Sequence, residues 1–123
     1  MKLILAYIPP DHLNGVIDAL SEHHVSGLTI SEAKGLGQER DPAHPQHQEH
    51  LGITMTRTLR LEIACQDEEL DGILTAIYQA AHTGLRWVGK IFVLPVETVL
   101  ALKTGVRGPA ALGSEPSGSA PRA

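Results

Sequence analysis

The sequence predicts an α+β domain with a ferredoxin-like βαββαβ order, a sandwich in which two helices cover one face of an antiparallel sheet. Two features of the pattern favour this fold class. Four short segments have the apolar runs or the alternation typical of strands, and two segments have apolar residues at helical spacing. The segments follow one another in the order that the fold requires, and a chain of 123 residues suits one small domain.

The first half of the chain predicts a strand, a helix and a second strand. Residues 3–8 form a short apolar run that a proline pair ends. Asp11 is expected to cap the next helix, and His23 and His24 to cap the carbonyls at its end. The apolar residues of that helix follow the i, i+3, i+4, i+7 spacing and are Leu13, Val16, Ile17 and Leu20. Residues 25–33 predict the second strand.

The second half predicts a long strand, a helix and a last strand. Residues 55–65 alternate, and their apolar side consists of Met55, Leu59, Leu61, Ile63 and Cys65. Residues 67–81 predict a helix whose apolar face consists of Leu70, Ile73, Leu74, Ile77 and Ala81. Residues 91–96 predict the last core strand. Cys65 is expected to be buried without a redox role. Glu62 could be a general base by residue type, and a structural ion pair with Arg60 on the same face of the strand is the alternative.

The first and last predicted strands are apolar on both sides, although two helices can cover only one face of the sheet. Self-association is the expected cover for the other face, so an oligomer is favoured. Burial of about 600 Å² of apolar surface in each subunit would contribute about 15 kcal/mol before the costs of association. A loop or tail folded over the same face is the alternative.

Composition and charge exclude several classes of function. The chain has a net charge of -4, only four aromatic side chains and no run of Lys or Arg, which argues against a general nucleic-acid surface. Its single cysteine cannot form an intramolecular disulfide, and its first apolar run is too short for a signal peptide or a membrane span. We therefore expect a cytoplasmic protein without nucleic-acid binding or membrane insertion.

Two polar segments stand apart from the predicted elements. Residues 38–50 contain prolines and histidines without a helical or strand period, which is typical of a long functional loop. In this loop His44, His47 and His50 could offer metal ligands, but no fixed geometry follows, and a solvated polar loop is the alternative. Residues 113–123 are expected to be a flexible tail.

The most informative motif lies in residues 83–90, which have the Gly-x4-Gly-Lys spacing of a phosphate-binding loop. Ile91 follows where a nucleotide hydrolase would need Ser or Thr to hold magnesium, and the loop joins a helix to a strand rather than a strand to a helix. The motif therefore argues against nucleotide hydrolysis. Taken alone it is a weak signal for phosphate binding, and an ordinary glycine turn is the alternative.

Three segments together resemble the PII signal-transduction family: residues 28–37, residues 83–93 and residues 102–105. The resemblance runs from Met1 to about Leu112. It implies a homotrimer of ferredoxin-like subunits that binds adenine nucleotides, ADP, AMP or ATP, in clefts between neighbours. It also implies a domain over residues 1–112 with three functional loops, a T-loop at about 36–55, a B-loop at 82–90 and a C-loop at about 101–112.

The resemblance assigns nucleotide-binding roles residue by residue. The phosphate-binding residues of the B-loop are Gly84, Arg86, Gly89 and Lys90. Adenine contacts come from Glu62, Ile63 and Ala64, with base and ribose contacts from a neighbouring subunit's Leu28 and Thr29. Gly35 and Gly37 begin the T-loop. Lys103 stands at one C-loop position where the family has a phosphate-binding arginine, but Ala101 stands at the other.

Several positions depart from the family pattern. The missing guanidinium at Ala101 predicts a preference for ADP or AMP over ATP. Leu51 replaces the tyrosine that many members carry for uridylylation, and Trp87 replaces a small glycine. Glu39 replaces a glutamine and Thr58 a lysine, which makes a response to 2-oxoglutarate doubtful.

These departures resemble the divergent branch of carboxysome-associated and bicarbonate-responsive PII-like proteins. The implied function is a non-enzymatic regulator whose T-loop docks on an unidentified transporter or enzyme of inorganic-carbon metabolism. Candidate residues for bicarbonate are Gln38, Glu39, Arg40 and Arg86. The alternatives are a nitrogen regulator that responds to ATP and 2-oxoglutarate, a slow ATPase, and a metal-tolerance or structural trimer of the same fold. No catalytic set and no defined metal site is predicted.

Overall fold

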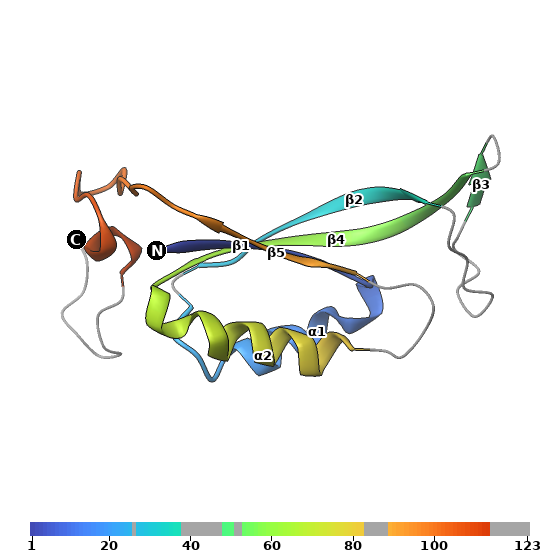
Figure 1. Ribbon diagram of the computed structural model, residues 1–123, viewed down its shortest axis with the longest axis horizontal. Helices are drawn as coiled ribbons and strands as arrows, with labels where there is room; N and C mark the ends of the chain where they lie inside the picture. The colour runs from blue at the N-terminus through green and yellow to red at the C-terminus, as the bar shows by residue number, and fades with distance from the viewer. Residues whose placement is uncertain (26, 38–47, 51–52, 83–88, 114–123) are drawn as a thin grey trace.

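The computed structural model describes residues 1–25, 27–37, 48–50, 53–82 and 89–113. Two helices and five strands make up the domain (Figure 1). The strands are β1 (Lys2–Ile8), β2 (Thr29–Gly37), β3 (Gln48–His50), β4 (Ile53–Cys65) and β5 (Ile91–Pro95). The α-helices are α1 (Leu13–Leu20) and α2 (Leu70–Ala81), and the short 3₁₀ helices are η1 (Pro10–His12), η2 (Asp67–Glu69) and η3 (Pro109–Leu112).

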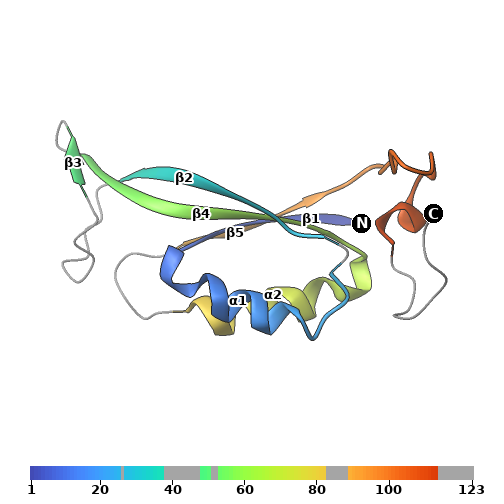
Figure 2. The same cartoon turned by 180° about the vertical axis from the view of Figure 1, so that it is seen from behind.

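The strands form one antiparallel sheet in the order β2-β4-β1-β5, with β3 paired to β4. The register places Leu5 opposite both Glu62 and Phe92, and Thr29 opposite Glu62. Both helices lie on the same face of the sheet in both views (Figures 1 and 2). This arrangement confirms the predicted ferredoxin-like α+β fold.

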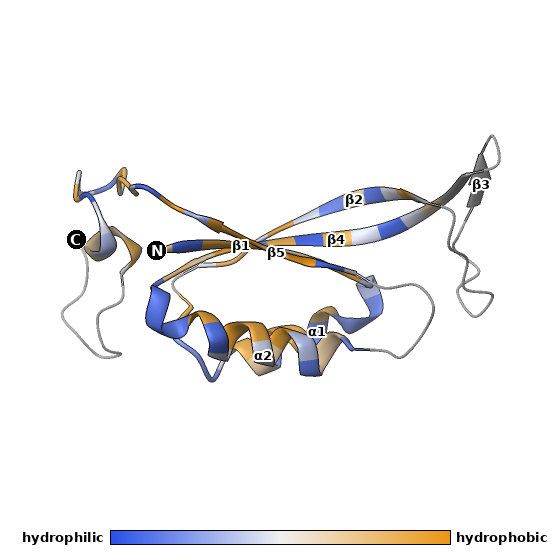
Figure 3. Cartoon of the chain, viewed as in Figure 1, coloured by the Kyte–Doolittle hydropathy of each residue, from blue (hydrophilic) through white to orange (hydrophobic). Residues whose placement is uncertain are grey.

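The core lies between the helices and the sheet. β1 and β4 each bury alternate side chains toward the helices, which confirms the predicted apolar side of β4 from Leu59 to Cys65. Apolar residues cluster where helices and sheet meet (Figure 3). The buried core consists of Ile4, Ala6, Ile8, Val16, Leu20, Leu59, Leu61, Ile63, Cys65, Ile73, Ala76 and Ile77. Cys65 is a buried free thiol, as expected.

The face of the sheet away from the helices, here called the open face, remains apolar and accessible. Phe92 is 50% exposed and Leu94 is 40% exposed on β5, and Leu3 and Leu5 are half-buried on β1. This distribution matches the two-sided apolar strands seen in the sequence. Among the described residues, no helix is long and apolar enough to cross a membrane.

Two local expectations were wrong. The second strand was expected at residues 25–33 but runs over Thr29–Gly37, because its pairing with β4 continues to Gly37 opposite Thr54 without needing apolar alternation. Asp11 does not cap α1; it lies inside η1, and the N-cap residue His12 makes no side-chain capping bond.

A third expectation, that histidines cap the carbonyls at the end of α1, is confirmed for His23, although its side chain is not the cap. The helix ends at Leu20, and the Ser21 hydroxyl donates a 2.6 Å hydrogen bond to the Asp18 carbonyl. His23 does cap the Leu20 carbonyl, but through its backbone N–H at 3.0 Å. Its ring lies against Gly72 of α2, where an added Cβ would meet the ring at 3.0 Å.

Candidate functional site

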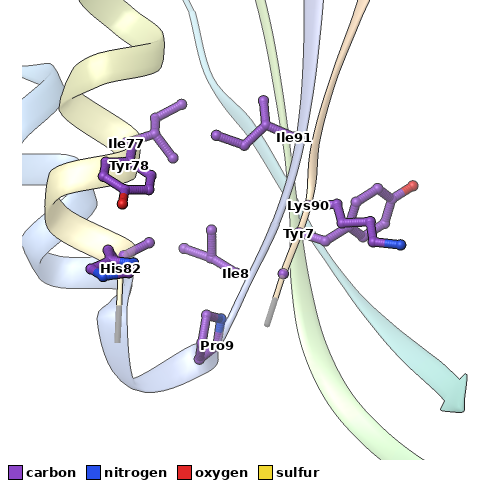
Figure 4. A pocket seen from close by; sticks show the side chains of 10 residues that line it. Tyr7, Ile8, Pro9, Ile77, Tyr78, His82, Lys90 and Ile91 are labelled. Atoms are coloured by element: carbon purple, nitrogen blue, oxygen red, sulfur yellow. The ribbon is translucent and has the colours of Figure 1, made fainter. Parts of the chain in front are cut away.

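The candidate site begins where Gly89 and Lys90 lead into β5. The backbone N–H of Tyr7 donates a 2.9 Å hydrogen bond to the Lys90 carbonyl, which fixes this segment against the end of β1. Figure 4 shows the side chains of Tyr7 and Lys90 on the side of the strands away from α2. Lys90 therefore presents its ammonium group on the open face, where an anion can reach it.

Gly89 has a steric reason to be glycine. A Cβ built at this position would overlap the Tyr7 carbonyl oxygen and lie 2.8 Å from the Tyr7 carbonyl carbon. The atoms it would meet belong to the backbone of a central strand, which cannot move as a side chain can. The absence of a side chain at Gly89 thus lets the loop approach β1 and sets the position of Lys90.

Glu62 and Ala64 occupy the same open face as Lys90, because they alternate with core residues on β4. The Glu62 carboxylate forms an ion pair with Arg60, with 3.2 Å between Oε2 and Nη2, which is the structural alternative that the sequence left open. Both side chains are partly exposed, so the pair contributes at most about 1 kcal/mol. Such a weak pair leaves the carboxylate able to exchange its partner for a ligand.

Ile63 differs from its two neighbours. Its side chain is 0% exposed and faces the helices, so only its main chain is available to a ligand. The pairing of β4 with β2 ends at Glu62, which lies opposite Thr29, and residues 63–65 of β4 come after this pair. In the described part of the sheet, β4 therefore has no partner strand on its β2 side at these residues, and a planar heterocycle could hydrogen-bond there.

Leu28 and Thr29 lie beside this end of β4 within one chain. Thr29 is the register partner of Glu62 and is exposed, and Leu28 directly precedes it. The resemblance gives Leu28 and Thr29 to one subunit and the adenine-contacting residues to another. In the single chain these residues are already neighbours.

Lys103 lies far from Lys90 in the same chain. Lys90 precedes β5 and Lys103 follows it, and the chain between them runs from one end of the sheet to the other (Figures 1 and 2). The five residues of β5 alone span about 16 Å. One phosphate group cannot reach both lysines of one chain, so a site that uses both needs two copies.

The C-loop that carries Lys103 is an ordered hairpin over residues 99–108. The Ala101 N–H donates to the Val106 carbonyl at 2.9 Å, and the Gly108 N–H donates to the Val99 carbonyl at 2.9 Å. Gly105 has φ +75°, a left-handed conformation that suits glycine at the turn. Lys103 is exposed in this turn.

A separate cavity of about 330 Å³ lies between α2 and the ends of β1 and β5, on the helix side of the sheet. Its walls are mostly apolar, with Ile8, Ile77 and Ile91 pointing inward (Figure 4). Because the Lys90 side chain points the other way, this cavity is not the place where Lys90 would meet an anion.

Thr58, which departs from the family pattern, has a structural role. The Thr58 side chain is buried, and its hydroxyl donates a 3.0 Å hydrogen bond to the Ile8 carbonyl. Arg57, its neighbour, pairs with Glu32 at 3.4 Å. Thr58 thus holds the end of β1 and offers no charge to a second effector.

Some of the remaining predicted residues lie in the hairpin of β2 and β4, and the others lie outside the described residues. Gly35 and Gly37 lie within β2, and β4 begins at Ile53, so part of the expected T-loop is an extended hairpin that also includes β3. The residues outside the described part are Gln38, Glu39, Arg40, Leu51, Gly84, Arg86, Trp87 and the tail from 114. His44 and His47 also fall there, and the described residues contain no group of three potential metal ligands.

Sequence reasoning missed Tyr7 as a site residue and assigned it to an apolar strand. Its ring packs edge-on against Phe92 at 6.0 Å between centroids, on the face that carries Lys90. The available signal was the alternation of β1, which puts Tyr7 on the same side as Leu3 and Leu5 and opposite to the core residues.

Comparison with known proteins agrees with this geometry. The family model described as nitrogen regulatory protein P-II matches residues 1–106. Nitrogen regulatory protein P-II of Azospirillum brasilense is 37% identical over 108 residues, which cover 88% of this chain and 96% of that protein. Nitrogen regulatory protein GlnK of Escherichia coli K12 is 33% identical over 112 residues, 91% of this chain and the whole of that protein.

Proteins of the matched family are regulatory signalling proteins that form homotrimers and bind adenine nucleotides as effectors. The match covers most of the chain and includes the sheet, both helices and the segment with Gly89 and Lys90. We conclude that the chain belongs to the P-II family of signal-transduction proteins.

Proposed function

We propose that this chain is a non-enzymatic regulator that binds ADP or AMP, in preference to ATP, between the subunits of a homotrimer. The observation that carries the proposal is the separation of Lys90, directly before β5, from Lys103, which lies beyond the other end of β5 in the same chain. Both are lysines at positions where the resemblance expects phosphate contacts. Two adjacent copies can bring one Lys90 and one Lys103 to the same phosphate group.

The apolar open face supports the assembly. Phe92 and Leu94 are large side chains left accessible by both helices, and a second copy would remove them from water. In that assembly the adenine would lie near Glu62 and the unpartnered end of β4, and the phosphates near Lys90. The ring of Tyr7 lies on the same face and would border the ligand.

The preference for ADP and AMP follows from charge. ATP carries one more phosphate than ADP, and its extra charge needs an additional cation or metal. At the two C-loop positions where the family has arginines, this chain has only one cation, Lys103, because Ala101 supplies no guanidinium. A lysine also cannot replace the bidentate contact of an arginine.

For the second effector we favour bicarbonate over 2-oxoglutarate, with the T-loop docking on a transporter or enzyme of inorganic-carbon metabolism. Glu39 would repel a dianionic keto acid, and Thr58 is held by its hydrogen bond to Ile8 where the family has a lysine. A small singly charged anion could use Arg40 or Arg86. The other candidate is nitrogen regulation that responds to ATP and 2-oxoglutarate; the relatives are nitrogen regulatory proteins, which favours a nitrogen-regulatory role.

A calorimetric screen tests both the nucleotide preference and the choice of second effector. ATP, ADP and AMP are titrated into the full-length protein, each with and without bicarbonate and with and without 2-oxoglutarate. We expect ADP or AMP to bind more tightly than ATP, and bicarbonate and ADP to strengthen each other's binding by the same factor. Tightest binding of ATP with 2-oxoglutarate would replace this proposal by the nitrogen-regulatory one. No binding of any nucleotide would overturn both.

A further inference from the structure

The C-loop hairpin is attached to the rest of the domain at a defined point. The hairpin closes where the Gly108 N–H donates to the Val99 carbonyl, and η3 begins at the next residue, Pro109. The Gln66 side-chain amide donates a 2.9 Å hydrogen bond, from Nε2, to the Pro109 carbonyl. A second attachment follows three residues later, where Leu112 is only 7% exposed.

Gln66 connects two parts of one chain that serve two neighbouring nucleotide sites in the proposed trimer. It follows Cys65 at the end of β4, two residues after Ala64 and four after Glu62. It precedes η2, and its backbone carbonyl accepts the N–H of Glu69 at 3.1 Å, which keeps this corner in a fixed turn. The same short segment therefore carries the adenine-facing residues of β4 and the amide that holds the C-loop.

We infer that Gln66 is a positioning residue for the phosphate end of the neighbouring site, acting through the Pro109 carbonyl on the hairpin that carries Lys103. This inference rests on the proposed function, in which Lys103 reaches the phosphates bound to a neighbouring subunit. Its ligand is the diphosphate end of an adenine nucleotide. Gln66 itself touches no ligand; it restricts the positions that the base of the hairpin can take.

The expected loss of nucleotide affinity follows from the strength of the hydrogen bond between Gln66 and Pro109. A neutral hydrogen bond at a partly exposed site contributes a small net free energy, which corresponds to a change in affinity of about three- to tenfold when it orders a binding group. Removal of the Gln66 hydrogen bond should weaken the binding only of ligands that Lys103 contacts. Adenosine has no phosphate, so its affinity should not depend on Gln66.

The test uses Gln66→Met, which keeps the length of the side chain and removes the donor without adding charge. Gln79→Met is the matched control, because Gln79 is exposed on α2 and belongs to another surface. ADP and adenosine are titrated into wild-type protein, both variants, Lys103→Ala and the double variant Gln66→Met/Lys103→Ala. Sedimentation and thermal melts verify that each variant is assembled and folded.

We expect Gln66→Met to weaken ADP binding three- to tenfold, to leave adenosine binding unchanged, and to add nothing in the Lys103→Ala background. Wild-type affinity for ADP, equal weakening of ADP and adenosine, or additive losses in the double variant would each overturn the inference. Failure of the wild-type protein to bind ADP would instead overturn the proposed function. If Lys103→Ala weakens ADP binding and Gln66→Met does not, only the role of Gln66 is lost.

Discussion

Gly89→Ala should damage nucleotide binding by a mechanism that can be traced atom by atom. The added Cβ would overlap the Tyr7 carbonyl oxygen, and the Ile8 Cα lies 3.6 Å away, so the three nearest atoms all belong to the backbone. β1 is held on both sides by β4 and β5 and cannot yield. The segment with Lys90 must therefore move away from β1, which breaks the 2.9 Å hydrogen bond from the Tyr7 N–H to the Lys90 carbonyl.

Two magnitudes follow from this displacement. The broken bond should lower the free energy of unfolding by about 1–3 kcal/mol, since it leaves a strand N–H unpaired. Removal of the Lys90 ammonium from its phosphate should cost about 1.5–3 kcal/mol, which is a ten- to hundredfold weaker binding of ADP. Urea denaturation measures the first quantity and calorimetry the second.

Gly15→Ala provides the matched control. A Cβ at Gly15 meets nothing within 4 Å, and the residue lies in the exposed part of α1. Alanine there should raise the free energy of unfolding by up to about 1 kcal/mol and leave ADP binding unchanged. Wild-type affinity of Gly89→Ala for ADP would refute the argument that close approach to Tyr7 sets the position of Lys90.

Three further outcomes can be checked by denaturation. Thr58→Val should lower the free energy of unfolding by about 1–3 kcal/mol, because the Ile8 carbonyl loses its donor in a buried place, and unchanged stability would contradict that role. Ile63→Ala should cost about 2–5 kcal/mol, whereas the same change at Ile30, which is 41% exposed on the edge strand β2, should cost much less; equal losses would contradict the difference in burial between these two positions. Burial, helped by the Glu69 carboxylate, raises the pKa of the Cys65 thiol, so folded protein keeps the proton that unfolded protein releases. Stability should therefore be complete below the ordinary thiol pKa of about 8.5 and decline as the pH rises above it. Cys65→Ala should remove the part of this alkaline loss of stability that Cys65 causes. If the free energy of unfolding falls equally steeply with pH in the variant, the raised pKa of Cys65 is contradicted.

Much of the fold could be predicted from the sequence because it depends on hydrophobic periodicity. The alternation from Leu59 to Cys65 and the helical spacing from Leu70 to Ala81 both correspond to buried faces. The errors occurred where main-chain pairing or local hydrogen bonds decide the structure. β2 continues to Gly37 because β4 lies beside it, and a residue's own side chain does not reveal that partner.

The candidate site was predictable in its residue types but not in its arrangement. The glycine and lysine motif marked Gly89 and Lys90, but the overlap with Tyr7 that requires glycine depends on a strand more than 80 residues earlier in the sequence. The attachment of the C-loop by Gln66 likewise joins residues 43 positions apart. Such long-range contacts depend on the packed fold, so no local pattern could have indicated them.

The most direct test of the account is sedimentation of the protein with ADP, with protein and nucleotide followed at separate wavelengths. The account predicts one boundary with three times the 13.2 kDa mass of the chain, and ADP that moves with it. A boundary of 13.2 kDa, or a trimer that leaves all ADP behind, would contradict a nucleotide site built between subunits.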